Sequence, residues 1–148
     1  MAQAPWAQQT VSPASFVGTW VGVQAWLVDP LPPGAEERQP VTLTIELVDG
    51  RLVGTLTPFF GGSDGAGFVE ATIVGDRLQA SGVMGTPQST TDGWTFTRNL
   101  RETWKQSVKI LFDLKADKTE LTGTADVLMG DVPWMKLGYE LSRKRSRY

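Results

Sequence analysis

Apolar and polar residues alternate with a period of two over much of the chain, and this pattern predicts β-strands. The alternation is clearest in residues 41–48 and 107–114. The apolar side chains are Val41, Leu43, Ile45 and Leu47 in the first segment, and Val108, Ile110, Phe112 and Leu114 in the second. Each of these strands is therefore expected to turn one face to a core and the other away from it.

Three hairpin-like units share the same order of residue types, at residues 47–55, 73–81 and 114–124. Each has an apolar strand end, a turn with Asp or Gly, and a second strand with Leu, small residues and Ser or Thr. Asp-Gly and Gly-Asp pairs between alternating segments are strong hairpin signals. Consecutive hairpins form an antiparallel meander, and a long meander removes its exposed edges by closing into a barrel.

The pattern predicts an all-β protein, a single antiparallel up-and-down meander barrel of eight or nine strands with no helix of ten residues. The expected strands cover residues 15–29, 41–48, 52–58, 68–74, 77–85, 107–114, 121–129 and 134–143. Residues 94–104 are a further strand or a strand that gives way to a turn. Loops are expected at 29–40, 59–67 and 86–93. The chain of 148 residues then divides into an N-terminal arm (1–14), a barrel domain (15–143) and a basic tail (144–148).

The chain contains no Cys and no His. Disulfides, thiolate nucleophiles, His bases and Cys or His metal sites are excluded, and we expect neither a metal nor a cofactor. The net charge of −2 gives no overall attraction to nucleic acid, although the C-terminus is basic. No apolar run of 18 residues predicts a membrane span. The Ala-x-Ala pattern at residues 2–4 favours a secreted or periplasmic bacterial protein; the alternative is a cytoplasmic one with an unstructured arm.

Gly18-Thr19-Trp20 opens the first long strand, and Arg143 or Lys144 lies at the end of the last one. In these residues the chain resembles the calycins, the group of barrels that includes lipocalins, avidins and fatty-acid-binding proteins. The resemblance implies that Trp20 closes one end of the barrel and that Arg143 packs across its ring. The connection at 29–40 is similar to the lipocalin loop over the barrel mouth, and residues 93–96 are similar to an avidin segment.

The chain also departs from these families. It has no lipocalin disulfide, it stops soon after the last strand where lipocalins have a helix, and residues 21–24 lack the polar side chains with which avidins bind biotin. The resemblance therefore implies the architecture of residues 15–145 and no particular ligand.

Small residues interrupt the bulky side chains of the expected inner faces at Gly54, at Ala80 or Gly82, and at Gly123. They either let the strands coil sharply or leave volume for a ligand, and the sequence leaves both readings open.

Aromatic side chains are the main candidates for a ligand site. Trp26, Trp94, Trp104 and Trp134 lie near expected strand ends, where they either wall a pocket or pack into the core. Phe59 and Phe60 precede a glycine-rich stretch and form either a flap over the mouth or a loop packed against the barrel. Arg98 lies between Trp94 and Trp104 in the sequence and could hold a carboxylate.

Three functions are compatible with these residues. The leading hypothesis is non-catalytic binding of a small hydrophobic or aromatic molecule inside the barrel. The alternatives are an accessory subunit that docks to a protein partner, and a small isomerase, cyclase or lyase. An enzyme would have to use carboxylate, Arg or Tyr groups, since His and Cys are absent. Glu46, Glu70 and Asp126 alternate with the apolar positions, so we expect them to be solvated.

Overall fold

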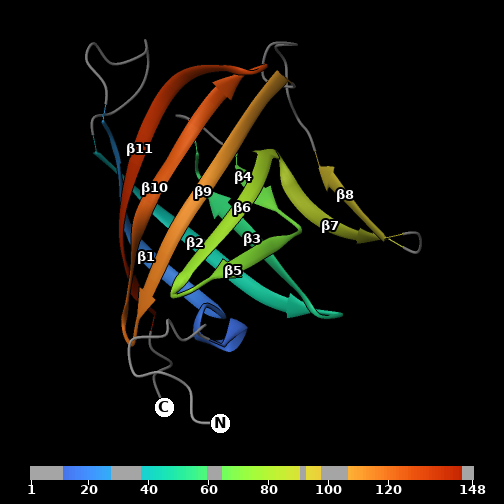
Figure 1. The fold of residues 1–148 in the computed structure, drawn as a ribbon, viewed down its shortest axis with the longest axis vertical. Helices are drawn as coiled ribbons and strands as arrows, with labels where there is room; N and C mark the ends of the chain where they lie inside the picture. Colours follow the sequence, from blue (N-terminus) through green and yellow to red (C-terminus); the bar gives the residue numbers. More distant parts are fainter. Residues whose placement is uncertain (1–11, 28–37, 60–64, 91–92, 98–106, 145–148) are drawn as a thin grey trace, which may run out of the picture.

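The computed structural model describes residues 12–27, 38–59, 65–90, 93–97 and 107–144. Within these ranges it contains one short 3-10 helix and eleven strands (Figure 1). The elements are η1 (Pro13–Ser15), β1 (Gly18–Trp26), β2 (Arg38–Val48), β3 (Arg51–Thr57), β4 (Ala66–Phe68), β5 (Ala71–Val74), β6 (Arg77–Met84), β7 (Thr86–Thr90), β8 (Gly93–Thr97), β9 (Val108–Asp117), β10 (Glu120–Met129) and β11 (Val132–Arg143).

Eight of the strands form a closed antiparallel barrel. Nine strands are hydrogen bonded in the order β4-β3-β2-β1-β11-β10-β9-β6-β5, and β4 also pairs with β6, which closes the ring and leaves β5 as an extra strand. The first strand, β1, pairs with the last strand, β11, so that Trp20 is opposite Arg143 and Trp26 is opposite Leu137. The sequence-based prediction of an all-β, up-and-down meander barrel is therefore confirmed.

The single strand expected at 68–74 is two strands, β4 and β5, which both pair with β6. Gly67 is opposite Val83, whereas Ala71 is opposite Ala80, so the chain advances four residues on one side and three on the other. This extra residue is a β-bulge between β4 and β5. After it, β5 keeps β6 as its neighbour but no longer pairs with β3. Alternation alone does not reveal such an interruption, because both pieces remain extended.

The prediction of a loop at 86–93 is wrong, because β7 pairs with β8 in a two-stranded hairpin (Figure 1). The polar sequence of β7 hides the pairing, whereas β8 lies where a strand is expected from the sequence to begin, at residue 94. Pro87 of β7 packs against β4: its Cδ lies 2.5 Å from the place where a Cβ on Gly67 would be. Pro87, near the start of the hairpin, thus contacts the barrel wall at a point where only glycine fits, and the hairpin extends from there to the side of the barrel (Figure 1).

The two ends of the barrel differ in their connections. The three near-repeated units form hairpin turns at the end where β1 begins, between β2 and β3, β5 and β6, and β9 and β10. The connections from β1 to β2, β3 to β4 and β6 to β9 are longer and join strands at the opposite end. We call the first the closed end and the second the open end. Long connections on a rigid scaffold commonly carry function.

Bulky side chains fill the inside of the barrel. The buried cluster takes every second residue from the strands, including Leu43 and Ile45 of β2 and Ile110 and Leu114 of β9. Phe68 occupies the space beside Gly54, and the ring of Phe112 lies 2.8 Å from where a Cβ on Gly82 would be. At Gly54 the missing side chain makes room for an aromatic ring of the protein itself; at Gly82 it makes room both for such a ring and for the Gly67 carbonyl oxygen of β4, 2.7 Å from the same Cβ position. Gly123 instead faces the backbone of Asp113 and Leu114, so it permits a close approach of β10 to β9.

Candidate functional site

The closed end is sealed by Trp20 and Arg143. The Trp20 side chain is fully buried, and its Nε1 donates a hydrogen bond of 2.9 Å to the carbonyl of Phe16. The guanidinium carbon of Arg143 lies 4.2 Å from the centre of the Trp20 ring. Its Nη1 and Nη2 donate to the carbonyls of Val17 and Ser15 at 2.6 and 3.0 Å. A planar guanidinium can stack on an indole and donate at its edge at the same time, which an ammonium cannot do.

Gln24 is the buried polar residue of the described interior. Its side chain is fully buried, and both ends of the amide are hydrogen bonded. Nε2 donates to the carbonyl of Phe59 at 2.8 Å, and the hydroxyl of Tyr139 donates to Oε1 at 2.8 Å. The amide therefore connects the wall strands β1 and β11 to Phe59, two residues after the end of β3. Buried polar groups persist in apolar cores when they are paired in this way.

Tyr139 continues this connection across the barrel. Its ring centre lies 6.4 Å from that of Phe112, which in turn lies 5.6 Å from that of Phe68. Burial raises the pKa of the Tyr139 hydroxyl far above its ordinary value, because the phenolate would lose its hydration. The hydroxyl therefore stays protonated and acts as a hydrogen-bond donor at physiological pH.

Three of the aromatic residues singled out from the sequence lie at the open end. Trp26 ends β1 and is buried, Phe59 follows β3 and is buried, and Trp134 is partly buried near the start of β11. The Phe59 side chain thus packs into the barrel interior. Phe60, Arg98 and Trp104 lie outside the described residues, and only the backbone of Trp94 is described, in β8. The export prediction also concerns residues outside the described ranges.

Gln24 was not among the residues singled out from the sequence, although a signal for it exists. The inward positions of β1 are Trp20, Gly22, Gln24 and Trp26, at a spacing of two. Counting from Trp20 therefore places a glutamine between two tryptophans on an otherwise apolar face. A polar residue at such a position predicts a specific hydrogen-bond partner inside.

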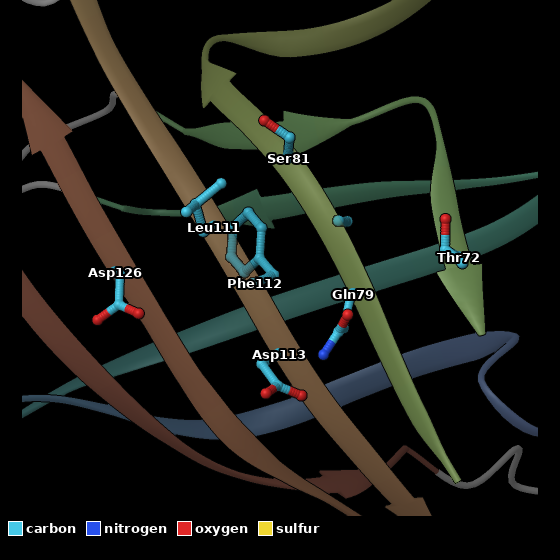
Figure 2. Close-up of a pocket in the computed structure, with 8 residues that line it drawn as sticks. Thr72, Gln79, Ser81, Leu111, Phe112, Asp113 and Asp126 are labelled. Carbon is cyan, nitrogen blue, oxygen red and sulfur yellow. The ribbon is translucent and has the colours of Figure 1, made fainter. Parts of the chain in front are cut away.

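Two pockets lined by described residues lie on the outer wall. The larger, about 480 Å³, runs over β5, β6, β9 and β10 and is lined by Thr72, Gln79, Ala80, Ser81, Leu111, Phe112, Asp113 and Asp126 (Figure 2). Its two carboxylates are already paired, Asp113 with Arg77 at 2.6 Å and Asp126 with Lys136 at 3.9 Å. The smaller, about 350 Å³, lies over β1, β10 and β11. Surface ion pairs of this kind are weak, and we assign neither pocket a ligand.

The charged side chains of the described residues lie at the surface. Glu46, Glu70 and Asp126 are exposed, in agreement with the expectation of solvated carboxylates, and Glu70 pairs with Arg51 at 3.3 Å. Within the described ranges, no group of three Asp, Glu, His or Cys side chains is placed to hold a metal ion. The same ranges include no helix with the length and hydropathy needed to cross a bilayer.

The open end is the candidate functional site, because the buried Phe59 lies there and is hydrogen bonded through its carbonyl to the Gln24–Tyr139 pair. No model of a protein family matches this chain, and neither a curated protein nor a solved structure is significantly similar to it. The function has to be argued from the geometry of this site.

Proposed function

We propose that this protein is a calycin-type barrel that binds a small, mainly apolar or aromatic molecule at its open end, without chemistry. The observation that carries the proposal is the complete burial of the Phe59 side chain. This residue follows β3 and belongs to no strand, yet its side chain is fully buried among the inner residues. It fills space that a ligand ring of similar size would fill. In the proposed bound state the Phe59 side chain leaves this place, and the ring of the ligand packs there instead.

The surroundings of Phe59 support this proposal. Trp26 and Trp134 lie at the same end, and tryptophan provides a large apolar surface together with one polar atom. The one ionisable side chain buried among the described core residues is Tyr139, which stays neutral. An acid–base reaction needs a group that titrates near the working pH, so binding fits this interior better than catalysis.

The proposal is tested with aromatic ligands on the whole chain and on two matched variants. Phe59→Ala removes a phenyl ring at the open end, and Phe16→Ala removes the same ring at the closed end, where Phe16 is also fully buried. Both variants are expected to lose about 3–5 kcal/mol of stability. We expect 2-ethylnaphthalene to bind the original protein and to bind Phe59→Ala more tightly, because no side chain has to leave.

Tryptophan fluorescence and native mass spectrometry measure the binding, and near-ultraviolet circular dichroism checks that each variant is folded. Phe16→Ala is expected to bind like the original protein. The proposal is wrong if folded Phe59→Ala binds none of a panel of naphthalene-sized ligands at their solubility limit. It is also wrong if Phe16→Ala gains as much affinity as Phe59→Ala, since the site would then not be at the open end.

A further inference from the structure

The orientation of the Gln24 amide is fixed by its two neighbours. The carbonyl of Phe59 can only accept a hydrogen bond, so the amide atom that faces it at 2.8 Å must be the NH₂ group. The amide oxygen then faces Tyr139, whose hydroxyl must be the donor in that bond of 2.8 Å. Tyr139 therefore holds a buried N–H donor of Gln24 toward Phe59 and the open end.

The acceptor is a backbone atom, so the donor loses its partner only when the backbone carbonyl of Phe59 moves away together with the side chain. The donor would remain within an apolar interior, and a buried donor without an acceptor is unfavourable. A hydrocarbon ligand would displace Phe59 and leave the Gln24 N–H unpaired. A ligand with a carbonyl oxygen would restore the hydrogen bond that the protein makes with its own backbone.

We propose that the ligand is a neutral carbonyl compound with an apolar or aromatic body, and that its carbonyl takes the place of the Phe59 carbonyl on Gln24 Nε2. The inference rests on the proposed function and specifies the ligand class of that site. The ligand is neutral because a carboxylate in this place would be buried against an amide and a protonated phenol. No Lys or Arg side chain is among the buried described residues to balance it.

The test uses three ligands with the same ring system, which differ only in the head group: 2-acetylnaphthalene, 2-ethylnaphthalene and 2-naphthoate. We expect the original protein to bind the ketone about three- to tenfold more tightly than the ethyl compound, which is the usual net effect of one neutral hydrogen bond. The carboxylate is expected to bind most weakly. The ratio of the ketone and ethyl affinities cancels the cost of moving Phe59, because both ligands require that movement.

Gln24→Leu is expected to bring this ratio to about one, since leucine has no donor. The matched control is Gln79→Leu, the same substitution at an exposed position on the outer face of β6, and it should keep the ratio of the original protein. The carbonyl stretch of bound, ¹³C-labelled ketone gives a readout on the unmutated chain. It should lie at a lower frequency than in an alkane solvent.

The outcomes separate the two proposals. If the ketone and the ethyl compound bind the original protein equally, or the carbonyl stretch matches that in alkane, the carbonyl inference is wrong and the binding site at the open end stands. If the carboxylate binds best, the ligand is an anion and the inference is likewise wrong. If none of the three binds the original protein or folded Phe59→Ala, the proposed function itself fails.

Discussion

Replacing Arg143 by methionine removes the contacts that seal the closed end while keeping a long apolar side chain. The stacking on Trp20 at 4.2 Å is of a type worth about 0.5–2 kcal/mol. Hydrogen bonds from charged donors contribute about 1.5–3 kcal/mol when they are sheltered, and Arg143 makes two short ones, to Val17 and Ser15. Because the side chain is partly exposed, we discount both contributions and expect a total loss of about 3 kcal/mol.

Arg143→Lys keeps the charge but cannot stack and donate to two carbonyls at once, so it should lose about half as much. Lys144→Met is the control, because the Lys144 side chain is exposed and its backbone N–H bond to Thr19, 2.7 Å, remains. Urea unfolding followed by tryptophan fluorescence measures the differences. With a slope of about 2 kcal/mol per M, the midpoint of Arg143→Met should fall by about 1.5 M. A midpoint equal to that of Lys144→Met would refute the reasoning.

Three further predictions concern the interior. Gly54→Val places methyl groups where the Phe68 ring lies, so the free energy of unfolding in urea should fall by about 1–3 kcal/mol. The control is Thr55→Val, at the next residue of β3, whose side chain points to the other face of the strand, and it should be nearly neutral. Tyr139→Phe leaves Gln24 Oε1 without its donor and should cost about 1–3 kcal/mol, while the double variant with Gln24→Leu should lose less than the two single losses added together. Because burial raises the pKa of Tyr139 above the unfolded value of about 10, its contribution to stability is complete below that pH and is lost as the pH rises further. Above about pH 10 the free energy of unfolding should therefore fall by up to about 1.4 kcal/mol per pH unit more in the original protein than in Tyr139→Phe. Equal pH dependence in the two proteins would contradict this role of Tyr139.

The barrel could be predicted from the sequence because its signals are local. The period-two alternation of β2 and β9 and the hairpin turns at Asp49-Gly50 and Gly75-Asp76 each depend on a few neighbouring residues. The bulge between β4 and β5 could not be predicted, since it depends on the register against β6. The pairing of β7 with β8 escaped prediction because residues 86–90 are polar and carry no period-two apolar pattern.

The candidate site was only partly accessible from the sequence. Trp26, Phe59 and Trp134 were identified by residue type, and their common position at the open end follows from strand direction. The roles of Gly54 and Gly82 could not be assigned, since the rings beside them, Phe68 and Phe112, come from other strands. The contact between Gln24 and Phe59 joins positions 35 residues apart and requires the folded barrel.

The pairing of β1 with β11 has a consequence for synthesis of the chain. The partners Trp20 and Arg143 lie near opposite ends of the described sequence, so the ring cannot close before the last strand leaves the ribosome. Until then β1 has one free edge, and the apolar inner face is exposed in a growing open sheet. Closure between such distant segments is also a slow folding event. Variants that weaken β11 should therefore lower the yield of folded protein in cells by more than their equilibrium stability indicates.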